Sequence, residues 1–227
     1  MRANEFLIEA AQQQNTLVLM SGGFHPFHAG HFALYMEAKK TFPNATVVVG
    51  ATNDMDKRPF PFDAKAKLAY LAGVEQGHFV EVQKQFNATE PSVEQFVKDP
   101  ETTALIYVRS EKDKGTYPMP PKVDPATGQL PLVTRGARKG QPVSDYLAYW
   151  PGAGKPLENM TRHGYMAYLK TVEFAGGLTS ASEIRAKWPT LDDAGKIDLV
   201  NKLYPKTMGN DKLTQYAIEQ LNIGMPG

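Results

Sequence analysis

Short apolar runs alternate with segments of helical periodicity through the first half of the chain, and this alternation limits the fold more than any other feature. Four runs rich in valine, isoleucine and leucine predict buried strands, at residues 16–23, 45–52, 78–83 and 104–110. Helical patterns separate them, at residues 28–42, 63–74 and 92–99, with Asp63 expected as the N-cap of the second helix. Strands joined through helices predict an α/β fold with a parallel sheet and flanking helices.

The second half of the chain is less regular. Between residues 115 and 161 the periodicity dissolves, and 8 of the 17 prolines lie there. This long insertion is either functional or a surface spectator. A fifth strand is expected within residues 165–177, followed by a helix over 178–189 and two amphipathic helices that cap the core. We therefore expect an α/β domain over residues 1–190, with the insertion at 115–161, and a C-terminal helical extension over 191–227.

Composition excludes several classes of protein. The 25 basic and 24 acidic residues nearly cancel, which argues against a nucleic-acid or membrane-surface partner attracted by bulk charge. The absence of cysteine excludes disulfides, thiolate zinc sites and cysteine nucleophiles. Glu5 and Glu9 interrupt the apolar patch at the N-terminus, and no stretch reaches the roughly 18 apolar residues of a membrane span. We expect a cytoplasmic protein.

Three of the five histidines lie within residues 21–31, "SGGFHPFHAGH", directly after the first predicted strand. Ligands of parallel sheets bind at the carboxyl ends of strands, which is where this segment lies. One interpretation is that the three histidines are structural residues of a turn. A metal site is less well supported, because carboxylates are lacking nearby and Pro26 and Gly30 interrupt a regular helix.

A phosphate site accounts for all parts of this segment at once. Glycines at the end of a strand let backbone N–H groups approach an anion, and the following helix presents its positive end to the same place. Histidines on the first helical turn add donors, which carry charge when a bound polyphosphate raises their pKa.

The segment "GGFHPFHAGH" resembles the first signature of the nucleotidyltransferase superfamily, whose core is histidine, any residue, glycine, histidine. The matching positions are Gly23, Phe24, Pro26, His28, Gly30 and His31. Residues 179–185, "TSASEIR", resemble the serine- and threonine-rich second signature that ends in arginine. The resemblance covers residues 16–189. Around the second signature, the sequence also resembles phage-encoded members of the superfamily. It implies a Rossmann-like parallel sheet.

The resemblance also implies a reaction. Members of the superfamily join a nucleoside triphosphate to a phosphorylated acceptor and release pyrophosphate, without an enzyme nucleophile and with Mg²⁺ held mainly by the phosphates. It implies catalytic roles for His28, His31 and Arg185, which would contact the triphosphate and the leaving pyrophosphate. The remaining nucleotide-binding positions that it implies are Gly22, Gly23 and Phe24 near the α-phosphate, Gly30 under the base, and Ser180 and Ser182 at the outer phosphates.

Some positions depart from the family pattern. His25 stands where relatives often have aspartate or glutamine, so its role is open. After the fourth strand many relatives carry a glycine and an acidic residue for the nucleoside, whereas this chain has Arg109 and Ser110, which we expect to line the nucleotide site. Lys57 and Arg58, after the second strand, are expected to hold the acceptor's phosphate or to form a solvated charge pair.

The Pro-Phe-His run favours an adenylyltransferase that uses ATP and acts on nicotinamide mononucleotide or a similar phosphate. A cytidylyltransferase that uses CTP and a polyol or sugar phosphate is the enzymatic alternative. A nucleotide-binding or assembly module without turnover is the alternative from another class. The acceptor and the oligomeric state stay open, and a homo-oligomer is compatible with the sequence.

Overall fold

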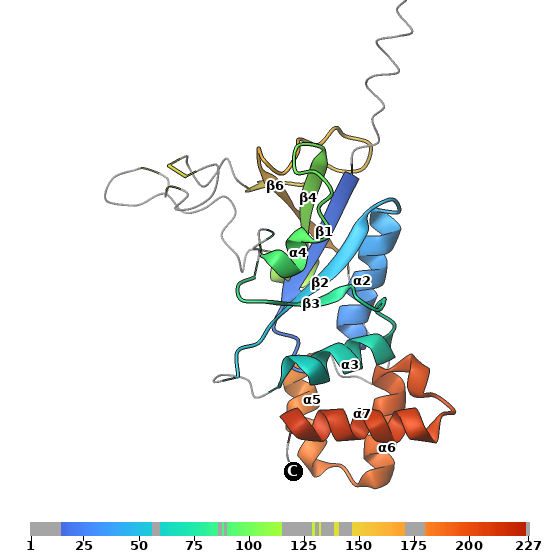
Figure 1. Ribbon diagram of the computed structural model, residues 1–227. Coiled ribbons are helices and arrows are strands. Elements are labelled where there is room, and N and C mark those ends of the chain that lie inside the picture. The colour runs from blue at the N-terminus through green and yellow to red at the C-terminus, as the bar shows by residue number, and fades with distance from the viewer. Residues whose placement is uncertain are drawn as a thin grey trace, which may run out of the picture.

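The computed structural model describes residues 15–55, 60–85, 88, 90–114, 129, 132, 139–140, 147–170 and 180–225. Within these residues, six strands form one sheet in the order β3-β2-β1-β4-β6-β5, and every neighbouring pair is parallel (Figure 1). The strands are β1 (Asn15–Gly22), β2 (Thr46–Thr52), β3 (Phe79–Val82), β4 (Thr103–Ser110), β5 (Leu147–Tyr149) and β6 (Gly164–Leu169). The predicted Rossmann-like α/β fold is confirmed.

Helices and short 3₁₀ turns connect and cover the strands. The helices are α2 (Ala29–Thr41), α3 (Phe62–Ala72), α4 (Pro91–Glu94), α5 (Ala181–Lys187), α6 (Asp193–Leu203) and α7 (Asp211–Gly224). The 3₁₀ turns are η1 (Glu111–Asp113), η3 (Trp188–Thr190) and η4 (Pro205–Thr207). Among the described residues, no helix is both long and apolar enough to cross a lipid bilayer.

Both faces of the sheet are buried, which explains why its strands read as nearly continuous apolar runs. Along β1, Val18 and Met20 point into the core formed with α2, α3 and the C-terminal helices. Leu17 and Leu19 point into a second, smaller core on the other face, which includes Val93 of α4. This alternation follows from the two-residue period of a strand.

Two details differ from the sequence-based expectations. Strand β5 lies inside the segment expected to be irregular, where it forms the edge of the sheet beside β6. A strand of three residues is too short to leave a periodic pattern in the sequence. Asp63 is not the N-cap of α3: Pro61 holds that position, and Asp63 lies in the first helical turn, where its negative charge still favours the helix.

The C-terminal helices pack onto the α/β core. Figure 1 shows α5, α6 and α7, in orange to red, gathered beside α3 at one end of the sheet. Leu199 and Val200 of α6 and Leu221 of α7 share one apolar cluster with α3. The indole N–H of Trp188 donates to Asn222 Oδ1 at 2.9 Å, which ties the end of α5 to α7. The helices therefore cap the core, and the domain division at residue 190 stays a prediction.

Candidate functional site

The histidine-rich segment forms a buried turn at the carboxyl end of β1, in the middle of the sheet. Strand β1 ends at Gly22 and α2 begins at Ala29. The ring of Phe24 folds back over Gly22, so a Cβ on that glycine would lie 2.8 Å from the Phe24 ring. Phe24 itself adopts a left-handed conformation with φ of 50°. The turn, which we call the histidine turn (residues 22–31), therefore depends on glycine at position 22.

Two histidines cap helix α2. The Gly30 N–H donates to His28 Nδ1 at 3.0 Å, and the His28 N–H donates to His31 Nδ1 at 3.3 Å. This is a capping box in which imidazole nitrogens take the place of the usual oxygens. Because each Nδ1 accepts a hydrogen bond, the network assigns the proton of each neutral ring to Nε2. Each histidine thus has an Nε2–H donor on the edge of its ring away from the backbone that it caps.

The surroundings keep both rings uncharged. Burial lowers the pKa of His28 to about 4, and its side chain is almost fully enclosed. Burial also lowers the pKa of His31 well below its usual value, and the neighbouring His28 and His25 add to this effect. Part of His31 stays exposed, but its ring stacks on His28 at 3.8 Å and meets Phe24 edge-on. At neutral pH, therefore, both rings are neutral hydrogen-bond donors, and the charge expected from the sequence requires a bound anion.

The second motif lies against the first. Arg185 Nη1 donates to the backbone carbonyl of His25, 160 residues away in the chain, and Arg185 Nη2 reaches Ser182 Oγ at 3.4 Å. Ser180 is the N-cap of α5, and its Oγ accepts from the Glu183 N–H. Thr179 and the residues just before it lie outside the described residues. The fold thus brings Arg185 to the histidine turn, with Ser182 next to Arg185.

A buried lysine beside the histidine turn was missed by the sequence analysis. Lys65 is fully buried, and its Nζ donates to the Thr52 carbonyl at 2.5 Å and lies 3.5 Å from His25 Nε2. A signal was available, because Lys65 shares the apolar face of α3 with Leu68 and Ala69, three and four residues on. A lysine at a core position of a helix points to a specific polar partner in the interior.

Of the remaining predicted site residues, Arg109 and Ser110 lie at the carboxyl end of β4, the strand that pairs with β1. Arg109 Nη2 donates to Gln85 Oε1 at 2.5 Å, and Arg109 Nη1 lies 3.9 Å from Asp113 Oδ2. Ser110 caps the turn η1, accepting from the Lys112 N–H. These contacts tie the carboxyl end of β4 to the segment that follows β3 and to η1. Residues 57 and 58, predicted to meet the acceptor, lie outside the described residues.

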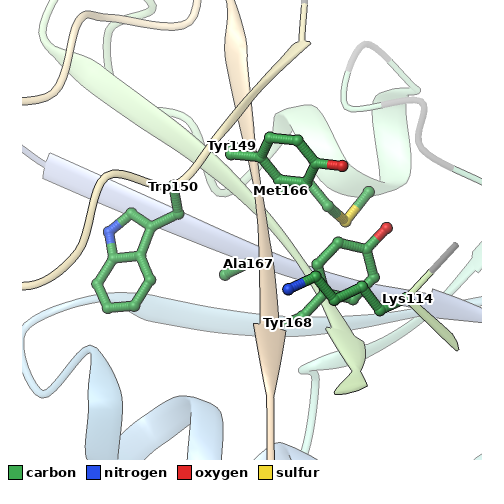
Figure 2. A pocket seen from close by; sticks show the side chains of 6 residues that line it. All are labelled: Lys114, Tyr149, Trp150, Met166, Ala167 and Tyr168. Carbon is green, nitrogen blue, oxygen red and sulfur yellow. The ribbon is translucent and has the colours of Figure 1, made fainter. Parts of the chain in front are cut away.

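A cavity of about 440 Å³ in the described part of the chain lies away from the histidine turn. It lies at the sheet edge, lined by Lys114, Tyr149, Trp150, Met166, Ala167 and Tyr168. Figure 2 shows the Trp150 ring on one side of β6 and the rings of Tyr149 and Tyr168 on the other. The Trp150 ring packs edge-on against Phe42, with ring centres 4.9 Å apart. The aromatic rings do not converge on a common centre, so we assign this cavity no role.

The chemistry of the histidine turn is that of a site for an anion. Imidazole Nε2–H groups and a guanidinium are hydrogen-bond donors, whereas the His28 and Gly30 N–H groups already donate to imidazole nitrogens. Within the described residues, no three or more histidine, aspartate or glutamate side chains are grouped to hold a metal ion.

One family model matches part of the chain. Residues 19–112, less than half of the chain, match a family model described as cytidylyltransferase-like. The matched range runs from within β1 into η1, and it includes the histidine turn and Lys65 but not α5.

Comparison with solved structures gives distant similarities. The crystal structure of a bifunctional NMN adenylyltransferase/ADP ribose pyrophosphatase from Francisella tularensis is 13% identical, with a TM-score of 0.44 over 91% of this chain and 53% of that chain. The same enzyme complexed with AMP and Mn ion is 13% identical, with a TM-score of 0.40 over 90% of this chain and 52% of that chain. The chain thus spans about half the length of these proteins, and the similarity is too low to assign a substrate. Among curated proteins, none matches the sequence.

Proposed function

We propose that the protein is a nucleotidyltransferase. It transfers a nucleotidyl group, preferentially adenylyl, from a nucleoside triphosphate to a phosphorylated small-molecule acceptor such as nicotinamide mononucleotide, and it releases pyrophosphate. The observation that carries the proposal is the contact of Arg185 with the His25 carbonyl, beside two histidines that offer Nε2–H donors. Two sequence motifs that resemble those of the superfamily thus form one cluster of hydrogen-bond donors.

The reaction requires no nucleophile from the protein. A phosphate oxygen of the acceptor attacks the α-phosphorus of the nucleotide, and the bond from that phosphorus to the bridging oxygen of the β-phosphate breaks. The electron pair leaves with pyrophosphate, so negative charge grows on the leaving group. Catalysis then depends on positioning the reactants and on stabilising this charge.

His28 and His31 would donate from Nε2 to the triphosphate and to the departing pyrophosphate. A neutral N–H donor is sufficient for this role, and the bound polyphosphate raises the pKa of both rings. Arg185 would hold the outer phosphates together with Ser180 and Ser182. A guanidinium has five N–H donors, so the bond to His25 orients the group and still allows others to meet a phosphate.

The other assignments rest on the resemblance. The amides of Gly22, Gly23 and Phe24 would approach the α-phosphate, and Gly30 would let the base lie close to α2. Arg109 and Ser110 would meet the nucleoside, and Lys57 and Arg58 the acceptor's phosphate. The donors at the turn do not fit a metal held by the protein, so Mg²⁺ would be held by the nucleotide's own phosphates, and no step is assigned to it.

The nucleobase requires a direct test. The matching family is described as cytidylyltransferase-like, whereas the Pro-Phe-His run favours an adenylyltransferase. We would measure pyrophosphate release with Mg²⁺, combining ATP and CTP in turn with nicotinamide mononucleotide, a polyol phosphate and a sugar phosphate. Release with one combination would identify both substrates.

Two variants control this assay. His31→Ala removes a donor from the turn and should abolish release, whereas His163→Ala removes a histidine that lies near Glu158, outside the turn, and should not. No release from any combination, with ATP still bound, would contradict the proposal and favour a nucleotide-binding module without turnover. Equal release from His31→Ala and the unmodified protein would contradict the assignment of the site.

A further inference from the structure

The C-terminal helices reach the histidine turn through one hydroxyl group. Tyr204, the residue at which α6 ends, is fully buried, and its hydroxyl donates to the Phe27 carbonyl at 2.8 Å. The two residues are 177 positions apart in the sequence. Tyr204 is itself held firmly, because its carbonyl accepts from both the N–H and the hydroxyl of Thr207, at 2.9 and 2.7 Å.

The peptide group that Tyr204 contacts also contacts His31. The Phe27 carbonyl and the His28 N–H belong to a single planar unit, so they turn together. That N–H donates to His31 Nδ1 at 3.3 Å. Tyr204 therefore acts on one end of the peptide plane while the imidazole of His31 accepts from the other end. A bond as long as 3.3 Å depends strongly on orientation, so it weakens if the plane turns.

We propose that Tyr204 is a positioning residue for His31. By fixing the Phe27–His28 peptide, it keeps the His28 N–H directed at His31 Nδ1, and this holds the proton of His31 on Nε2, the nitrogen that would face the phosphates. The C-terminal helices are then part of the candidate site as well as a cap on the core. The consequence for turnover rests on the proposed function, whereas the consequence for the His31 tautomer does not.

The test compares two hydroxyl deletions. Tyr204→Phe removes the donor to Phe27 and preserves the ring. Tyr165→Phe is the matched control, since the Tyr165 hydroxyl also bonds to backbone, accepting from the Glu158 N–H at 2.8 Å, but at the start of β6. Both proteins would be labelled with ¹⁵N-histidine, and the His31 ring nitrogens would be assigned by their loss in His31→Gln.

In the unmodified protein and in Tyr165→Phe we expect His31 to carry its proton on Nε2. In Tyr204→Phe we expect a second population, with the proton on Nδ1. Unchanged His31 resonances in folded Tyr204→Phe would overturn the proposal.

A second variant covers the case in which Tyr204→Phe does not fold. Tyr204→4-aminophenylalanine keeps an N–H donor at the same place, although a weaker one than the phenol. We expect this variant to keep His31 mainly in the Nε2–H tautomer but to displace the His31 Nδ1 resonance from its position in the unmodified protein, because the weaker donor holds the Phe27–His28 peptide less firmly. A resonance identical to that of the unmodified protein would contradict the proposal where this variant is the only one that folds.

Turnover gives a separate readout. If His31 stabilises the leaving pyrophosphate, Tyr204→Phe should lower kcat about tenfold, the effect of one hydrogen bond, with KM for the nucleotide changed by less than about twofold. If the unmodified protein releases no pyrophosphate but the tautomer changes in Tyr204→Phe, the proposed function fails and Tyr204 keeps its role. If the protein is active and neither kcat nor the tautomer changes, the role of Tyr204 is refuted and the function stands.

Discussion

Acidification should destabilise the protein through the histidine turn. The pKa of His28 is about 4 in the folded protein and about 6.5 in the unfolded chain. The unfolded chain therefore binds this proton more readily, so the stabilisation is fully present above about pH 6.5 and is lost as the pH falls through 6.5 towards 4. Between about pH 7.5 and about pH 5, His28 alone should remove about 2 kcal/mol from the free energy of unfolding. His31, whose pKa is also lowered, acts in the same direction.

Urea unfolding at these two pH values measures the loss. His28→Asn is the informative variant, because asparagine can still accept from the Gly30 N–H at the N-cap but does not titrate. We expect its free energy of unfolding to fall by about 2 kcal/mol less than that of the unmodified protein over this interval. His163→Asn, a change outside the turn, should retain the full pH dependence. The reasoning would be refuted by an equal loss in His28→Asn and the unmodified protein.

Three further predictions concern single substitutions. His31→Ala should lower turnover at least about a hundredfold, close to 3 kcal/mol in the barrier, in a protein whose circular dichroism is unchanged; a folded variant with normal pyrophosphate release would contradict the assignment. Arg185→Lys keeps the charge but loses the planar fork that reaches both the His25 carbonyl and Ser182, so kcat/KM for the nucleotide should fall at least about tenfold, a loss that steady-state kinetics would detect or exclude. Gly224→Ala should lower the free energy of unfolding by about 1–3 kcal/mol in urea titrations, since the new Cβ would lie 1.8 Å from the buried Phe60 ring; unchanged stability would show that the ring moves aside without cost.

The strands and the first motif could be predicted because their causes are local. The apolar runs predicted as strands correspond to β1 to β4, since strands buried on both faces need apolar side chains at nearly every position. The capping of α2 is also local, because His28 and His31 are three residues apart, the spacing of a capping box. A short sequence window contains everything that these two features require.

The two errors in the sequence-based prediction, at β5 and at the start of α3, have causes that do not lie in the local residue pattern. Strand β5 pairs with β6 through backbone hydrogen bonds, which depend little on side chains, so its three residues gave no signal. At the start of α3, Asp63 resembles a cap in composition, but proline at position 61 already has the extended conformation that an N-cap needs. In both places the backbone decided the structure, whereas the prediction relied on residue type.

The sequence by itself determined the parallel α/β fold and the presence of two motifs that resemble those of the nucleotidyltransferases. Only the tertiary structure decided how the motifs meet: Arg185 contacts the His25 carbonyl, Lys65 lies buried beside His25, and Tyr204 donates to the Phe27 carbonyl. The reason is that each of these side chains is at least 40 positions in the sequence from the residue that it contacts in the turn. Such contacts depend on how helices pack against the sheet, and no local pattern of residues records that packing.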